Sequence, residues 1–164
     1  MKKKVFDFNV LGEALRADTQ AFLDSYAAKY PADGPILAFC LYFDVAMDAT
    51  GMLLPQRAAN QAVGAAIDDV ASWYRYADHV QGELSEPTQT LFEAYQELME
   101  DEDADEDEII AQFTQMIRTV IHQLSFDKVP KTDDFIYFAD GMDDEYEQWK
   151  ETIPPALLKK HFGI

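Results

Sequence analysis

Residues 35–56 read PILAFCLYFDVAMDATGMLLPQ, and the expected architecture is arranged around them. The run Ile36–Asp44 is apolar at every position but its last, and Gly34 and Pro35 precede it. It is too short to cross a membrane. Its aromatic and branched side chains favour a strand buried on both faces, although periodicity alone leaves a buried helix open. A second apolar run, Gly51–Gln56, follows a gap of small and polar residues, which predicts a hairpin.

A third apolar segment, Phe135–Asp140, also has the aromatic and branched residues of a strand, and the residues before it, 130–134, are expected to form a loop. The sequence therefore predicts an α+β fold, in which a small sheet of about three or more strands is packed against several helices. The chain has 164 residues, of which 48% are hydrophobic. That length and composition predict a single domain, residues 1–164, with a substantial core.

Apolar residues at helical spacing predict the helices around this sheet. The first helix is expected over residues 9–30, with Asn9 as its cap and Pro31 ending it. The strongest helical pattern covers residues 109–124. Residues 72–79 are expected to be irregular or a short strand. Further helical segments are expected at residues 61–71, 85–100, 142–151 and 156–162.

The composition is strongly acidic, with 31 acidic and 13 basic residues and a net charge of −18. A field of this sign repels phosphate backbones and anionic membrane surfaces, so we expect neither nucleic acid nor membrane as a partner. The partners that such a charge attracts are basic proteins and cations. The alternative is that the acidity only keeps the protein soluble.

Cys40 is the one cysteine of the chain, so no internal disulfide can form. This is typical of a reducing compartment. Because a reactive thiolate needs a partly exposed, electropositive setting, a buried structural thiol is favoured over a nucleophile. The basic start Met1–Lys4 is followed by Val5–Asn9, which interrupts any signal-peptide core. We therefore expect a cytoplasmic protein.

The sequence contains none of the common catalytic or nucleotide-binding motifs. It has no glycine-rich phosphate loop, no GxSxG or HExxH, and no paired cysteines for zinc. His79, His122 and His161 are far apart in sequence, and structural roles are favoured for them; His122 suits the C-terminus of its helix. We assign no catalytic residue, and we expect no cofactor and no metal.

The acidic run suggests an EF-hand, but its spacing fails. Asp101, Asp103 and Asp105 match the first three calcium-ligand positions of such a loop. The next position holds Glu106 where the loop needs glycine, and the twelfth holds Gln112 instead of glutamate. A frame starting at Asp103 is no better. The favoured interpretation is a solvated loop followed by the first turn of a helix.

The acidic residues gather in the second half of the chain. Residues 100–164 contain 17 acidic and 6 basic residues, which gives −11 of the −18. One group is the run 100–108, acidic everywhere except Ala104, and a second group follows the third strand. One negative surface formed from both groups would steer the approach of a basic partner. The predicted partner-binding residues are Asp101, Asp103, Asp105, Asp107, Asp140, Asp143, Asp144 and Glu145.

Aromatic residues near these acids have two interpretations. Tyr137, Tyr146 and Trp149 would add contact area to such an interface. The alternative, which is favoured for each ring, is a place in the core.

The order of Ile36–Asp44, Gly51–Pro55 and Ala58–Asn60 resembles an uncharacterised bacterial family, domain of unknown function number four-three-zero-three. The family is similar in its apolar strand, short gap, second strand ending near proline, and alanine-asparagine helix start. Trp73–Ala77 resembles the aromatic stretch of the family but departs from its tryptophan-centred form. The resemblance covers most of the chain and implies no catalytic residues. Because some such domains lie beside toxin genes, it implies by analogy an immunity role.

Three kinds of function are compatible with the sequence. The first is an acidic protein-binding domain, which includes an immunity-type inhibitor that occludes a basic partner such as a toxin nuclease. The second is an enzyme whose site assembles from dispersed residues such as Asp44, Arg75, His79 and Asp140. The third is a structural or scaffolding domain, either monomeric or dimeric.

Overall fold

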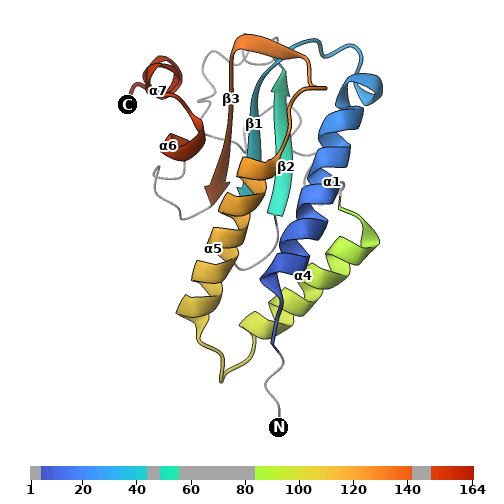
Figure 1. The fold of residues 1–164 in the computed structure, drawn as a ribbon, viewed down its shortest axis with the longest axis vertical. Helices are drawn as coiled ribbons and strands as arrows, with labels where there is room; N and C mark the ends of the chain where they lie inside the picture. The colour runs from blue at the N-terminus through green and yellow to red at the C-terminus, as the bar shows by residue number, and fades with distance from the viewer. Residues whose placement is uncertain (1–4, 44–48, 56–83, 142–148) are drawn as a thin grey trace.

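A computed structural model describes residues 5–43, 49–55, 84–141 and 149–164. Its centre is a sheet in which β1 (Ile36–Phe43) lies between β2 (Ala49–Pro55) and β3 (Lys131–Gly141), as Figure 1 shows. β2 runs antiparallel to β1, as the predicted hairpin requires, whereas β3 runs parallel to β1. Helices accompany this sheet on both faces, so the predicted α+β class is confirmed.

Successive residues of β1 enter two different cores, as the alternation of a strand dictates. Phe39 and Leu41 belong to a large core shared with α1, α4 and α5, while Ala38 and Cys40 belong to a smaller core shared with α6 and α7. All four side chains have no exposed surface. The expectation that this strand is buried on both faces is therefore confirmed, and it explains why apolar residues occupy both parities.

Three helices form the large core with one face of the sheet: α1 (Phe8–Lys29), α4 (Glu86–Met99) and α5 (Glu106–Gln123). The predicted apolar stripe of α1 is buried, with Leu11 and Leu15 fully enclosed. α1 and α5 approach closely at Gly12, where an added Cβ would lie 3.0 Å from Cγ of Met116. The glycine therefore permits this helix pair to touch.

The other face is covered by two short helices, α6 (Trp149–Thr152) and α7 (Pro155–Phe162). Figure 1 shows them on the side of β3 that is remote from α1. Gly163 ends α7 with a left-handed conformation, φ 74°, which glycine adopts without a steric penalty. Trp149 is buried in the smaller core, so its core interpretation is confirmed.

The structure corrects three local predictions. α1 begins one residue earlier than expected, because the carboxylate of Asp7, and not Asn9, accepts hydrogen bonds from the first backbone N–H groups of the helix. Residues 131–134 are not a loop but the start of β3, where Lys131 pairs with Ile36. β2 begins at Ala49, ahead of the expected Gly51, because Ala49 already pairs with Phe43.

The sequence at the start of β3 has the composition of a loop because the strand is irregular there. Its register shifts between the pairs Ile36–Lys131 and Ala38–Ile136, so several polar residues bulge out of the ladder. Several predictions lie outside the described residues: the helix over 61–71, the segment 72–79 and most of the helix over 142–151. Asp44 and Gln56, at the ends of the predicted strands, also lie outside them.

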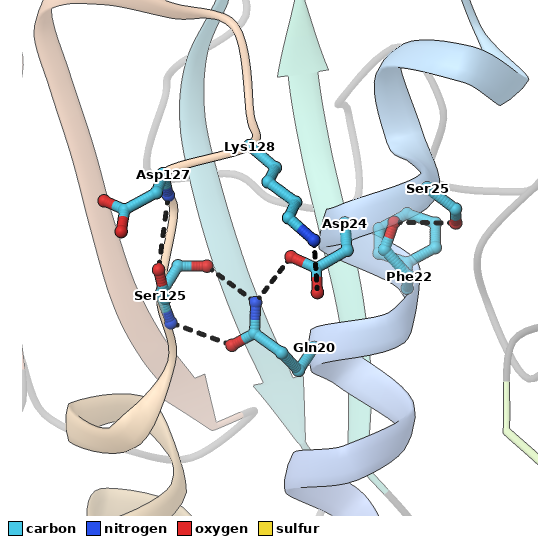
Figure 2. A network of polar contacts seen from close by, with 7 residues as sticks. All are labelled: Gln20, Phe22, Asp24, Ser25, Ser125, Asp127 and Lys128. Atoms are coloured by element: carbon cyan, nitrogen blue, oxygen red, sulfur yellow. Dashed lines mark hydrogen bonds and ion pairs between the residues drawn. The ribbon is translucent and has the colours of Figure 1, made fainter.

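A side-chain amide fastens α1 to the connection between α5 and β3 (Figure 2). Nε2 of Gln20 donates to the backbone oxygen of Ser125 at 2.9 Å, and the backbone N of Ser125 donates to Oε1 of Gln20 at 2.8 Å. Nε2 also donates to the carboxylate of Asp24 at 2.9 Å, and Nζ of Lys128 lies 3.9 Å from that carboxylate. The side-chain amide of Gln20 thus makes the two hydrogen bonds with the backbone of Ser125 that a paired strand residue would make with its own backbone.

We expect Gln20→Glu to lower the free energy of unfolding by about 1–2 kcal/mol at neutral pH. A carboxylate cannot donate to the Ser125 carbonyl, and it would repel Asp24. Urea unfolding followed by circular dichroism measures the effect. Gln115→Glu, an exposed change of the same charge on α5, is the control and should stay within about 0.5 kcal/mol. Equal effects of the two variants would contradict a role for the amide pair.

Asp134 holds α7 against β3. Its Oδ2 lies 2.7 Å from Nζ of Lys160, and its Oδ1 accepts a hydrogen bond from the Thr132 hydroxyl at 2.8 Å. Nε2 of His161 lies 3.1 Å from the Asp134 backbone oxygen. The hydrogen bond from Lys160 lowers the pKa of Asp134 below its ordinary value.

Because the folded-state pKa of Asp134 is lowered, its carboxylate stabilises the fold above the unfolded value of about 4, and this contribution is lost as the pH falls through the lowered pKa. We expect Asp134→Asn to cost up to about 1 kcal/mol at neutral pH, since the pair is partly exposed. The cost should vanish in acid. Urea unfolding at neutral pH and at an acidic pH below the lowered pKa tests this. The control is Asp133→Asn, the same change at the exposed neighbouring residue. A cost that is the same at both pH values would contradict it.

Candidate functional site

The predicted acidic run, residues 100–108, forms the connection between α4 and α5 and the first turn of α5. We call these residues the acidic turn. Backbone hydrogen bonds close it: the N–H of Asp101 donates to Leu98, and that of Ala104 donates to Asp101, at 3.2 and 3.0 Å. Oδ1 of Asp101 accepts from the backbone N of Asp103 at 3.0 Å. Every acidic residue of the turn is exposed. In Figure 1 the turn lies at the lower end of the molecule, where the N-terminal segment also begins.

Some of these acids start the next helix. Asp105 is the N-cap of α5, and its Oδ1 accepts a hydrogen bond from the backbone N of Glu108 at 3.2 Å. Glu106, Asp107 and Glu108 occupy the first turn, where the helix dipole favours negative charge. The sequence interpretation of a loop followed by a helix start is therefore confirmed.

The EF-hand is excluded by the same geometry. A calcium loop that starts at Asp101 would have to run to Gln112, but α5 begins at Glu106 and occupies its second half. Among the described residues, no three His, Cys, Asp or Glu side chains are grouped so that they could hold a metal ion.

The predicted partner-binding residues divide into separate places. Asp101, Asp103, Asp105 and Asp107 lie together on the acidic turn. Asp140 is near the end of β3 and accepts a hydrogen bond from Nε1 of Trp149 at 3.3 Å, on the face covered by α6. The turn joins helices of the opposite face, so Asp140 does not share its surface. Asp143, Asp144 and Glu145 lie outside the described residues.

Beside the turn lies an acidic groove, which we define as the hollow of about 690 Å³ between residues 5–10, α4 and α5. Phe6 and Phe8 form one wall, with their rings 4.8 Å apart in an edge-to-face contact. Both rings lie 6.1 Å from the ring of Tyr95 on α4. Tyr95 stacks on Phe113 of α5 at 4.7 Å and has no exposed surface. The wall is therefore anchored in the large core.

The groove combines an apolar floor with a negative rim. Leu91, Leu98 and Ile109 contribute to the floor. No lysine or arginine is among the described residues that line it. The acidic residues that line it are Asp7, Glu97, Asp101, Asp103, Asp105 and Glu108. Such a site suits a ligand with apolar and cationic parts.

A larger hollow of about 970 Å³ lies on the other side of the same N-terminal segment, between α1 and α5. Much of its α5 wall is uncharged and polar, including Gln112, Gln115 and Thr119. It lacks the negative rim of the acidic groove, so its lining does not indicate which class of ligand would bind there.

The groups that resemble catalytic residues have structural partners. Cys40 is buried, as expected. Burial raises the pKa of its thiol well above the ordinary value, and the charge of Asp140 adds to the effect, which disfavours the thiolate that a nucleophile needs. His122 lies 3.3 Å from Glu151, next to the ion pair between Arg118 and Glu151 at 3.1 Å. Asp44, Arg75 and His79, proposed as parts of a dispersed active site, lie outside the described residues.

Sequence reasoning missed the groove. Val5–Asn9 served only as an argument against a signal peptide, and Glu97 lies in the predicted helix over residues 85–100, where no role was assigned to it. One signal was present: phenylalanine at positions 6 and 8, separated by the Asp7 that caps the helix. A phenylalanine on each side of an N-cap indicates a helix entry that packs on a neighbouring element.

No protein-family model matches the chain, and neither the curated proteins nor the solved structures contain a match. The resemblance to the domain of unknown function therefore stays a prediction. None of the helices in the described ranges has the length and apolar character that crossing a membrane demands.

Proposed function

We propose that this chain is an acidic protein-binding domain that docks onto a basic surface of another protein through its acidic turn. The observation that supports this most directly is an uncompensated charge. Eight of the nine residues 100–108 are acidic. In the part of the chain that the structure describes, no lysine, arginine or histidine forms an ion pair with any of them.

Crowded like charges repel one another, so the approach of cations lowers the electrostatic free energy of the turn. A basic protein surface delivers several cations at once in fixed positions, which favours it over dissolved salt. The −18 net charge of the chain extends the attraction beyond the turn and would speed the encounter.

The more specific form of the proposal is an immunity-type inhibitor. Nucleases that bind phosphate backbones present basic active sites, and an acidic turn placed over such a site would block it by occlusion, without chemistry of its own. The absence of catalytic motifs from the sequence is compatible with this role.

Titration of the full chain into purified basic nucleases tests the proposal, with calorimetry for binding and cleavage assays for inhibition. We expect binding that is strong at low salt and weak at high salt, because the contacts are exposed charges. Asp103→Asn/Asp107→Asn should weaken it severalfold. The matched control Asp127→Asn/Asp133→Asn makes the same change in charge at exposed positions away from the turn. Absence of binding, or binding that is indifferent to salt, would overturn the proposal.

A further inference from the structure

We propose that the acidic groove receives one face of a basic amphipathic helix. This inference rests on the proposed function and goes beyond it, because it names the docking place and the chemistry of the partner segment. The occupant would insert apolar side chains between the N-terminal segment and α4, and lay lysine or arginine side chains along the rim.

One wall of the groove is apolar and already formed. The rings of Phe6 and Phe8 are held against Tyr95, and Tyr95 is stacked on the buried Phe113. A binding wall fixed in this way loses little conformational freedom when a partner docks.

Exposed apolar side chains also line the acidic groove. Val5 is 91% exposed and Val10 is 47% exposed, and both line the groove. Among the described residues, the only other large apolar side chain with comparable exposure is Ile164, at the C-terminus. A docked helix would remove both valines from water, which an ion or a purely polar ligand would not do.

The rim selects the charge of the occupant. Six acidic residues surround the floor, and no basic residue among the described lining offsets them. A second copy of this chain would bring −18 of the same sign, so self-association through this face is disfavoured. Lysine and arginine on the occupant meet the rim with complementary charge.

The walls also favour a helix over an extended peptide. α4 and α5 use their own backbone hydrogen-bonding groups internally, so the groove offers no sheet edge to pair with a strand. A helical occupant satisfies its own backbone and presents apolar and cationic residues on one side at helical spacing.

The test uses a synthetic helical peptide of leucine and lysine with one apolar face, labelled for fluorescence anisotropy. Its comparison peptides are a scrambled sequence of the same composition and a leucine–glutamate version. We expect the full chain to bind the amphipathic basic peptide at least about tenfold more tightly than the scrambled one, and not to bind the acidic one.

Variants assign the binding to the groove. Glu97→Gln should weaken binding about threefold, and Val10→Ser threefold to about tenfold. Glu93→Gln, one turn earlier on α4, and Ile164→Ser are the matched controls and should change affinity less than about twofold. All four positions are exposed, so the fold tolerates the changes, which circular dichroism checks.

The outcomes separate the two proposals. If groove variants and controls weaken binding equally, or if the scrambled peptide binds as well, the groove inference is overturned while charge-driven binding stands. If a basic nuclease binds but the peptide does not, the groove inference is again overturned. If neither binds, both proposals fall.

Discussion

Phe113→Ala is expected to lower the free energy of unfolding by about 3–5 kcal/mol, the range measured when a large aromatic side chain is deleted from a core. Phe113 has no exposed surface. Its ring stacks on Tyr95 at 4.7 Å and lies 6.4 Å from Phe92 and 6.0 Å from Phe43. One side chain of α5 therefore contacts both α4 and β1, so its loss opens a cavity where three elements meet.

Urea unfolding followed by circular dichroism measures the change. A loss of this size is a large fraction of the roughly 5–15 kcal/mol typical of natural domains, so the unfolding midpoint should move to a clearly lower urea concentration. Phe113→Leu, which keeps most of the volume, should cost less than about 1.5 kcal/mol. A cost of Phe113→Ala below about 1 kcal/mol would show that the large core does not depend on this contact.

The same variant bears on the groove. Phe113 supports Tyr95, and Tyr95 supports Phe6 and Phe8. The affinity of Phe113→Leu for a basic amphipathic peptide should change little, because leucine keeps most of the side-chain volume that supports Tyr95.

Local sequence patterns predicted the elements that are buried along their whole length, on both faces for β1 and on one face for α5. β1 was recognisable because cores on both of its faces require apolar residues at consecutive positions. α5 was recognisable because one face of it is almost wholly buried, from Ile109 to Ile121. In both cases the environment of the element is uniform along its length, so composition and period report it directly.

The pairing of β3 with β1 was beyond the sequence. β3 lies beside β1 and parallel to it, although a long stretch of chain separates the two. Its polar start, Lys131–Asp134, had the composition of a loop, because the bulge and the ion pair with Lys160 place polar side chains there. Asp134 contacts Lys160 and His161 of α7, and no local window of sequence contains these contacts.

The candidate site divides in the same way. The acidic turn was predictable, since its acids are consecutive and their roles as N-cap and first-turn residues are local. The separation of Asp140 from that turn depends on which face of β3 the side chain occupies. The groove needs Phe6, Glu97 and Glu108 to meet in space, and only the packing of α4 against the N-terminal segment brings them together.

Trp149→Ala is expected to detach α6 and α7 from the sheet and to cost about 3–5 kcal/mol. Trp149 is 3% exposed, its ring lies 5.1 Å from Phe138 and 4.6 Å from Phe162, and its Nε1 donates to Asp140. It is the largest member of the small core, which has few other side chains to replace it.

The small core also encloses Cys40, which gives a local readout for this loss. In the native protein the buried thiol, with its raised pKa, should react with a disulfide reagent only as fast as the fold opens. In Trp149→Ala the reaction should be faster by a factor of about ten or more. The helical circular dichroism signal should be largely kept, because most of it comes from the helices of the large core. Trp149→Phe, which retains an aromatic ring but not the hydrogen bond to Asp140, should leave Cys40 nearly as protected. A thiol that stays unreactive in Trp149→Ala would mean that α6 and α7 cover the sheet without this ring, and that the small core is held by contacts other than those of Trp149.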